Sequence, residues 1–324
     1  MTARPSKPLL KWPGGKARLA AVVADAFGSE RPTGYHEPFA GGAAVYWHLL
    51  ERGLLDDLVE PAQLTDTCGS LIVAYRAVRD DPAFVRQVLD ELGRHHLEPR
   101  AWTDDYYAVR RLFNGYRRAV LPPLPEAAFR ETPTNTTARR HGAQMLWLNR
   151  ACFNGLWRTN RRGDFNAAKG SYQHVRVPDL APWAAALAGV RLSWCDWRWT
   201  VRAAKRGAWL FADPPYLPLD DQAGTFTSYS SSVTWDETEH EQLALALVAA
   251  ARRGVLTNHD CERTHTIYSH ARGFRRHASV DLSRSISQSK DRMVAREVVL
   301  TLDPADANPV VHRPFQPSLL GATT

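Results

Sequence analysis

The chain has 324 residues, 44% of them hydrophobic, and its 41 Lys and Arg against 34 Asp and Glu give a formal net charge of +7. This length suffices for one sizeable core plus a smaller domain, and the basic excess suits a polyanionic partner without requiring one. The four cysteines are widely spaced, with no Cys-x-x-Cys pair, and no apolar stretch is long enough to span a membrane. We therefore expect a cytoplasmic protein with reduced thiols, no disulfide framework, no zinc site and no membrane segment.

Two glycine-rich loops near the N-terminus each lead into a helical pattern. The first is KWPGGK at residues 11–16, and the second is EPFAGG at residues 37–42. Gly41 and Gly42 allow the backbone to pass close to a ligand at a strand-to-helix turn. Asp66 follows at near the roughly twenty-residue distance at which Rossmann-like folds place an acid on a ribose diol. These features indicate a nucleotide-like ligand near the N-terminal half of the sheet.

The middle of the chain is predicted to be mostly helical. Residues 71–78, 84–92 and 106–114 have helical patterns, whereas residues 121–137 contain four prolines and read as a loop between helices.

Basic, aromatic and amide side chains alternate across residues 148–166. An Arg-Arg-Gly-Asp turn between Trp157 and Phe165 predicts a hairpin. Such a hairpin could enter a DNA groove and offer Arg158 to guanine acceptors. A basic surface hairpin without a ligand is the simpler alternative for this pattern alone.

Two later strands end in acids followed by aromatics. Residues 190–197 end in Asp196-Trp197, and residues 209–216 (WLFADPPY) form an apolar strand that stops at two prolines. Proline cannot continue a hydrogen-bonded ladder, and ligands bind at this edge of open α/β sheets. The Asp213 carboxylate and the Pro214 carbonyl present two acceptors beside the Tyr216 ring, an arrangement that suits a planar amino group.

The C-terminal third reads as a helix at residues 239–251, strands near 255–260 and 297–302, and a proline-rich tail. His259, Cys261 and His265 form only a loose cluster, so we expect no metal site.

Taken together and in this order, these sequence motifs resemble those of the Dam-like N6-adenine DNA methyltransferase family (α-group, DPPY motif) over about residues 8–300. The likeness includes FTSY at residues 226–229 and RSIS at residues 284–287. It implies an α/β fold: a Rossmann-like S-adenosylmethionine-dependent methyltransferase sheet with an inserted, mostly helical DNA-recognition domain that carries a β-hairpin. The implied domains are residues 1–70 and 187–302 for catalysis, 71–186 for target recognition, and 303–324 as a disordered tail.

The resemblance also implies three sets of site residues. Those implied in catalysis are Asp213, Pro214, Pro215 and Tyr216. Those implied in cofactor binding are Trp12, Lys16, Glu37, Pro38, Phe39, Gly41, Gly42, Asp66, Asp196, Trp197 and Asp213. Those implied in DNA binding are Phe153, Asn154, Leu156, Arg158, Asn160, Arg161 and Arg162. The chain departs from the family pattern at residues 67–69 and 167–170, which leaves the register after Asp66 and the flanking DNA contacts less defined.

The implied reaction is methyl transfer from S-adenosylmethionine to the N6 of an adenine flipped out of duplex DNA, by direct in-line transfer without a metal. The implied target is a short palindrome such as GATC, and the expected enzyme is a cytoplasmic monomer whose restriction endonuclease, if it has one, is a separate protein. An amino-methyltransferase acting on RNA or on a protein glutamine would not need the hairpin. A catalytically silent DNA-binding regulator would not need Asp213.

Overall fold

The computed structural model describes residues 4–5, 7–94, 99–171, 175–176, 178–217, 235–250, 253–271, 273–283 and 294–303. The strands are β1 (Tyr35–Glu37), β2 (Gln63–Asp66), β3 (Phe129–Arg130), β4 (Arg191–Cys195), β5 (Trp209–Ala212), β6 (Arg253–His259), β7 (Phe274–Ser283) and β8 (Val294–Leu302). The helices are η1 (Lys16–Arg18), α1 (Ala20–Phe27), α2 (Ala44–Glu51), α3 (Gly69–Asp80), α4 (Pro82–Arg94), α5 (Pro99–Val120), α6 (Thr136–Ala151), η2 (Phe153–Gly155), α7 (Ala181–Leu187), α8 (Trp197–Ala203), α9 (Glu237–Ala249) and α10 (Glu262–His270).

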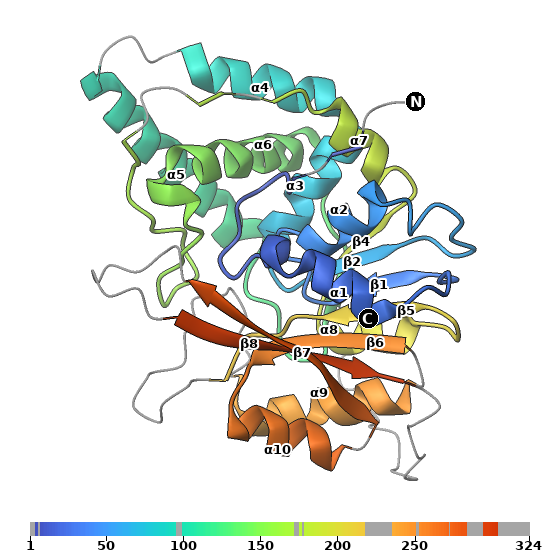
Figure 1. Cartoon of the computed structure of the whole chain (residues 1–324). Coiled ribbons are helices and arrows are strands. Elements are labelled where there is room, and N and C mark those ends of the chain that lie inside the picture. The colour runs from blue at the N-terminus through green and yellow to red at the C-terminus, as the bar shows by residue number, and fades with distance from the viewer. Residues whose placement is uncertain are drawn as a thin grey trace, which may run out of the picture.

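In these ranges the strands form one sheet in the order β3-β4-β2-β1-β5-β6-β8-β7 (Figure 1). The neighbours from β4 to β6 run parallel, whereas β3, β8 and β7 each pair antiparallel with a neighbour. Strand β5 is apolar and fully buried because helices cover both faces of the sheet, as is typical of parallel sheets. The carboxyl ends of β1, β2, β4, β5 and β6 therefore share one edge, where an open α/β sheet binds its ligands.

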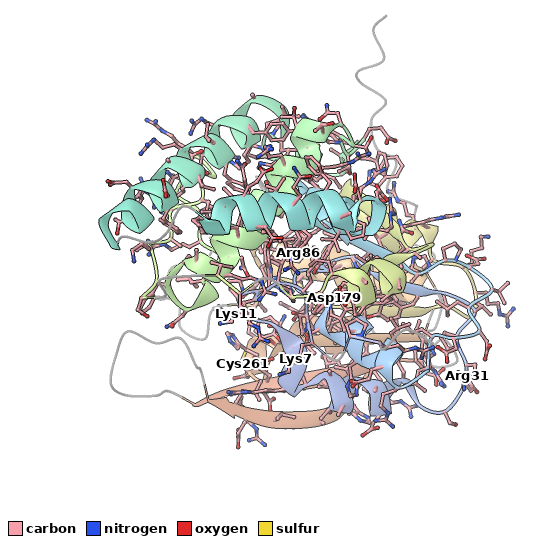
Figure 2. The ribbon with its side chains drawn as sticks, turned by 90° about the horizontal axis from the view of Figure 1, so that it is seen from above. Lys7, Lys11, Arg31, Arg86, Asp179 and Cys261 are labelled. Atoms are coloured by element: carbon pink, nitrogen blue, oxygen red, sulfur yellow. The ribbon has the colours of Figure 1, made fainter. Side chains whose placement is uncertain are left out.

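Helices lie on both sides of the sheet (Figure 1). Helices α1 and α3 contact strands from one side, and α8 and α10 contact strands from the other, with α9 packed on α8 and α10. Beyond α3 lies a helical layer in which α6 packs against α3, α4 and α5. Figure 2 views the molecule from above and places Arg31 at one edge, away from the helical layer that carries Arg86.

Helix α3 joins the sheet to the helical layer. It contacts β2 and β4 on one side and α6 on the other, so one hydrophobic core runs through both parts. The contact with α6 is close at Gly142, where an added Cβ would lie 2.9 Å from the Ala77 Cβ atom. The helices expected at residues 71–78, 84–92 and 106–114 are confirmed within α3, α4 and α5.

Residues 121–137 differ from the predicted loop in one respect. Phe129 and Arg130 form strand β3, which pairs with β4 and adds an antiparallel edge to the sheet. Asn135 then caps helix α6, because its side-chain oxygen accepts a hydrogen bond from the Ala138 N–H at 2.9 Å. Prolines on both sides thus flank a short piece of regular structure that the composition did not indicate.

Several predicted features lie outside the described residues. These are the segments at residues 226–229 and 284–287 and the tail from residue 304. Among the helices that are described, none is long and apolar enough to cross a membrane.

Candidate active site

The turn that follows strand β5 carries the acid on which the site is built. Asp213 is the first residue beyond β5, at the carboxyl edge of the sheet. Its Oδ1 accepts a hydrogen bond of 2.7 Å from the Thr257 hydroxyl on β6, and its Oδ2 lies 3.0 Å from the Lys16 ammonium. Lys16 also donates to the Gly14 carbonyl. The first glycine loop and the proline turn therefore meet at one carboxylate.

Tyr216 is the aromatic wall of this cluster. The Lys16 ammonium lies 4.7 Å from the centre of its ring, and its hydroxyl donates a 2.8 Å hydrogen bond to the Glu297 carboxylate on β8. Burial, with the nearby charges of Asp213 and Glu297, raises the pKa of Tyr216 well above its ordinary value, so the hydroxyl remains a donor. Neither Glu297 nor Thr257 was among the predicted site residues. Glu297 could have been noticed in the sequence because it is an acidic residue in a strand that is otherwise mostly apolar.

The second glycine loop is fixed by Asp66 at the end of β2. The Asp66 carboxylate accepts hydrogen bonds from the Gly41 N–H at 3.0 Å and the Cys68 N–H at 2.8 Å. Burial raises its pKa to about 6, although these backbone hydrogen bonds oppose the rise. Gly41 has a φ of 46°, and an added Cβ would lie 2.7 Å from Trp12 Cδ1. Trp12 thus closes over the loop, and only glycine fits beneath it.

Glu37 ends strand β1 inside the protein. Its side chain is 2% exposed and accepts a 2.7 Å hydrogen bond from the Tyr35 hydroxyl. Burial raises the pKa of Glu37 to about 8, with a smaller contribution from the Asp213 charge. Pro38 is buried beside it, and Phe39 packs edge-on against Trp235 with ring centres 5.2 Å apart.

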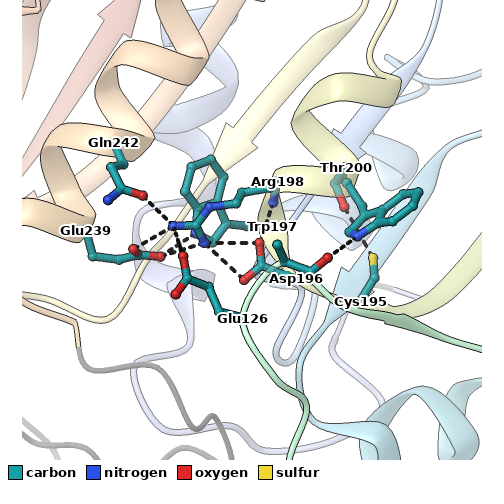
Figure 3. Close-up of polar contacts among 10 residues, drawn as sticks. Glu126, Cys195, Asp196, Trp197, Arg198, Thr200, Glu239 and Gln242 are labelled. Atoms are coloured by element: carbon teal, nitrogen blue, oxygen red, sulfur yellow. Dashed lines mark hydrogen bonds and ion pairs between the residues drawn. The ribbon is translucent and has the colours of Figure 1, made fainter. Parts of the chain in front are cut away.

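Asp196 and Trp197 belong to a buried ion network around Arg198 (Figure 3). The Asp196 carboxylate accepts from the Arg198 N–H at 2.9 Å and pairs with the Arg198 guanidinium at 3.3 Å. Trp197 Nε1 donates to Glu239 at 2.8 Å. Arg198 also contacts Glu239, Gln242 and Glu126 at 2.7, 2.6 and 3.1 Å. Asp196, which the resemblance implies in cofactor binding, is therefore already engaged by Arg198.

The predicted hairpin is confirmed as a turn with an antiparallel bridge between Thr159 and Phe165. Asn160 shapes it, because its side-chain oxygen accepts from the Arg162 and Asp164 N–H groups at 2.9 and 3.0 Å. The structure thus gives Asn160 a role inside the turn, beside the DNA contact expected for it.

The side chains expected to meet DNA differ in exposure. Phe153 is 53% exposed, Asn154 has a φ of 53°, and Leu156 is half-buried. Arg158 is exposed and donates from Nε to the Asn166 side chain at 2.9 Å, and Arg161 and Arg162 are exposed at the turn.

Helix α5 anchors the hairpin. Asn114 bonds both the N–H and the carbonyl of Phe165, and Arg117 pairs with Asp164 at 3.1 Å. Trp157 stacks on Phe165 and also on Trp12, with ring centres 4.7 and 5.6 Å apart. The hairpin therefore contacts the same tryptophan that covers the Gly41 loop. Asn114 and Arg117 were missed because their partners lie about fifty residues away in the chain.

The histidines and cysteines of the site region have other partners. His259 Nδ1 hydrogen-bonds the Leu217 carbonyl at 2.7 Å, and His265 pairs with Asp260 at 2.6 Å. All four cysteines are free thiols. Across the described ranges, no group of three or more His, Cys, Asp or Glu side chains is arranged to hold a metal ion.

Comparison with known proteins finds one matching family and several relatives. The sequence model of a family described as D12 class N6 adenine-specific DNA methyltransferase matches residues 12–286. The chain is 31% identical over 295 residues to a DNA adenine methylase of Serratia marcescens, covering 87% of this chain and 94% of that protein. It is 30% identical over 297 residues to a DNA adenine methylase of Haemophilus influenzae (89% and 90% covered). It is 27% identical over 252 residues to the type II methyltransferase M.MjaIII of Methanocaldococcus jannaschii (74% and 78% covered).

Proposed function

Because the chain belongs to the D12 class N6 adenine-specific DNA methyltransferases, we propose that its proline turn is the place where an adenine of duplex DNA is methylated. The enzyme methylates adenine in DNA, which sets aside the alternatives of an RNA or protein-glutamine methyltransferase and of a silent regulator. We propose further that the substrate is a flipped adenine, that S-adenosylmethionine is the methyl donor and that transfer is direct and in line.

The proposed chemistry follows from the two acceptors of the turn. The N6 lone pair of adenine is delocalised into the ring and is a poor nucleophile. When Asp213 and the Pro214 carbonyl hold the two amino protons, the nitrogen is favoured in a form whose lone pair points at the methyl donor. One observation supports this role of Asp213 as an acceptor. The Lys16 ammonium lies 3.0 Å from Asp213 Oδ2, so this oxygen is accessible to a nitrogen donor.

Base flipping is required by the position of these acceptors, which cannot reach N6 inside a stacked duplex. Extrusion of a base costs a few kcal/mol of lost stacking. Tyr216 offers its ring to the extruded base, and the exposed Phe153 of the hairpin fits a wedge that fills the gap in the duplex. Arg158 is proposed to read guanine, while Arg161 and Arg162 contact phosphates.

The cofactor proposal depends on the loop around Gly41. The residues present fit S-adenosylmethionine: the Gly41 backbone has no room for an added Cβ beneath Trp12, and the buried carboxyl of Glu37 and the partly buried carboxyl of Asp66 end two neighbouring strands. Trp12 would cover the bound molecule, and Asp66 would take the ribose hydroxyls while it orients the Gly41 N–H. When bound, S-adenosylmethionine supplies the methyl group. We further propose that the enzyme acts as a monomer and that any restriction endonuclease is a separate chain.

The test is substitution of Asp213. Asp213→Ala is expected to abolish transfer of labelled methyl groups to duplex DNA while leaving the affinities for S-adenosylmethionine and DNA close to wild type, because the acceptor acts mainly as charge develops at N6. Asp25→Ala, which removes an exposed acid of helix α1, is the matched control and should retain full activity. Turnover by Asp213→Ala near that of the wild type would refute the proposed role of the turn.

A further inference from the structure

The proline turn is held by imidazole side chains. Pro214 and Pro215 have no N–H and so cannot anchor the turn through their own backbone donors. The Pro215 carbonyl instead lies 3.0 Å from Nε2 of His240, on helix α9. Two residues further, the Leu217 carbonyl lies 2.7 Å from Nδ1 of His259. Two ring nitrogens from different elements thus contact alternate carbonyls of the turn.

We propose that His240 is a positioning residue for methyl transfer: by donating from Nε2 to the Pro215 carbonyl, it fixes the turn whose Asp213 carboxylate and Pro214 carbonyl receive the adenine amino group. This inference rests on the proposed function of the turn. His240 does not touch the substrate in this scheme and acts only through Pro215.

The protonation of His240 suits this role. Its side chain is fully buried, and burial lowers its pKa to about 4, so the ring is neutral at physiological pH and carries one proton. A carbonyl can only accept, which assigns that proton to Nε2. Nδ1 is then the acceptor for the Tyr268 hydroxyl, 2.9 Å away and itself buried. The Pro215 carbonyl therefore fixes the tautomer, and the Tyr268 hydroxyl donates to the ring nitrogen that remains.

The helix that carries His240 is itself fixed by charge. Glu239, the preceding residue, pairs with Arg198 of α8 at 2.7 Å and accepts from Trp197 Nε1 at 2.8 Å (Figure 3). Asp236 caps the helix by accepting from the Glu239 N–H at 3.0 Å. A buried ion pair one residue away from the imidazole thus sets the position of α9. Because the helix is fixed there, His240 can hold the turn in one position.

The size of the effect follows from the demands of group transfer. Misplacement of a reacting group by about 1 Å can lower a rate on the order of 100-fold. A buried carbonyl that loses its donor also tends to move towards another partner. Loss of the His240 bond should therefore slow the chemical step more than it weakens binding of either substrate.

The experiment compares three variants of the full-length enzyme that differ in the donor they place near Pro215. In His240→Gln the amide nitrogen reaches about as far as Nε2, in His240→Asn it reaches only to the place of Nδ1, and His240→Leu has no donor. The single-turnover rate is measured with labelled S-adenosylmethionine and plasmid DNA from a methylation-free host. Each rate is divided by the active fraction, obtained from the stoichiometry of S-adenosylmethionine binding.

The expected result is a rate per active molecule lowered by about 10- to 100-fold in the Leu and Asn variants. The Gln variant should recover most of the wild-type rate, and cofactor and DNA affinities should stay unchanged in all three. A purely structural role predicts instead lower active fractions with a wild-type rate per active molecule, and that outcome would overturn the inference. If the Leu variant does not fold, equal rates for Asn and Gln would overturn it.

Asp213→Ala, measured alongside, distinguishes a failure of the proposed function from a failure of the role proposed for His240. If Asp213→Ala stays active, the proposed function of the turn fails whatever His240 does. If Asp213→Ala is inactive and His240→Leu has the wild-type rate per active molecule, only the role of His240 fails.

Discussion

Lys16 and Asp213 form a close ion pair, with the Lys16 ammonium 3.0 Å from Asp213 Oδ2 and their side chains only 6% and 19% exposed. The resemblance implies both Lys16 and Asp213 in cofactor binding, and the structure pairs them with each other. The ammonium lies where the amino group of the target adenine is proposed to bind. An incoming adenine must therefore share or replace this donor.

Replacement of Lys16 by methionine should impair methylation by at least about tenfold, because removing one partner of a largely buried ion pair leaves the other charge uncompensated. The chain offers a matched control in Lys205→Met, since the Lys205 side chain is 72% exposed and its ion pair with Glu60 contributes little. Initial rates on plasmid DNA, at saturating cofactor, provide the comparison. Equal activity of the two variants would show that the Lys16–Asp213 pair has no part in the reaction.

Tyr216 and Glu297 should affect the transfer rate through the one hydrogen bond that joins them. Tyr216→Phe keeps the aromatic face but loses the hydroxyl, and Glu297→Ala loses its acceptor; each is expected to lower the transfer rate about tenfold, the scale of a hydrogen bond to a charged group. The double variant should be no slower than the worse single variant. Rates for the three proteins complete the cycle, and strictly additive losses would mean that the two residues act separately.

Asp66 should control cofactor affinity through the Gly41 loop. Asp66→Ala leaves two backbone N–H groups without their acceptor and removes the proposed ribose ligand, so the affinity for S-adenosylmethionine should fall at least tenfold. Calorimetric titration of the protein without DNA measures this directly. Asp57→Ala, which removes an 81% exposed acid, should bind as the wild type does. An unchanged affinity of Asp66→Ala would place the cofactor elsewhere.

Glu37 should make the stability of the cofactor-free protein depend on pH. Its pKa is about 8 in the folded protein against an ordinary value of 4.5. Between these values the folded state binds more protons than the unfolded chain, so the free energy of unfolding should fall as pH rises through this window. Glu37→Gln, which keeps an acceptor for Tyr35, should flatten that fall. Urea unfolding from pH 5 to pH 9 tests this, and identical pH profiles for both proteins would contradict it.

Local patterns predicted the elements of the site but not the contacts between them. The run WLFADPPY predicted a buried strand that stops at Asp213, because an apolar tetrapeptide and two prolines leave few alternatives. The hairpin was predictable for the same reason, since its turn residues specify it locally. Both predictions depend on residues adjacent in the chain.

The ion pairs could not be predicted because they join distant segments. Lys16 meets Asp213 across almost two hundred residues, and Arg198 meets Glu239 across 41. No local pattern around Asp196 indicates that its carboxylate pairs with the buried Arg198. Strand β3 was likewise unpredictable, because its pairing depends on the exposed edge of β4.

The last prediction concerns sequence choice by the hairpin. The Arg158 guanidinium is exposed, and its Nε–H and one amino group point at Asn166, at 2.9 and 3.4 Å. Its other N–H groups are the ones proposed to contact a guanine, whose O6 and N7 can form a bidentate contact worth about 1–3 kcal/mol of discrimination. Arg158→Ala should therefore relax specificity at one guanine of the recognised site. Asn166→Ala keeps the Arg158 guanidinium but removes the side-chain oxygen that holds it. This variant should therefore relax specificity at the same guanine to a smaller extent.

Arg161 provides the matched comparison, because it is exposed at the tip of the turn and is proposed to contact phosphate. Arg161→Ala should weaken binding to all sequences alike and reduce the slope of log affinity against log salt by about 0.9. Single-molecule sequencing of plasmids methylated in a methylation-free host reads out the motif for each protein and tests whether it is GATC. If Arg158→Ala kept the wild-type motif at undiminished stringency, the proposed role of Arg158 as the base reader of this hairpin would be wrong.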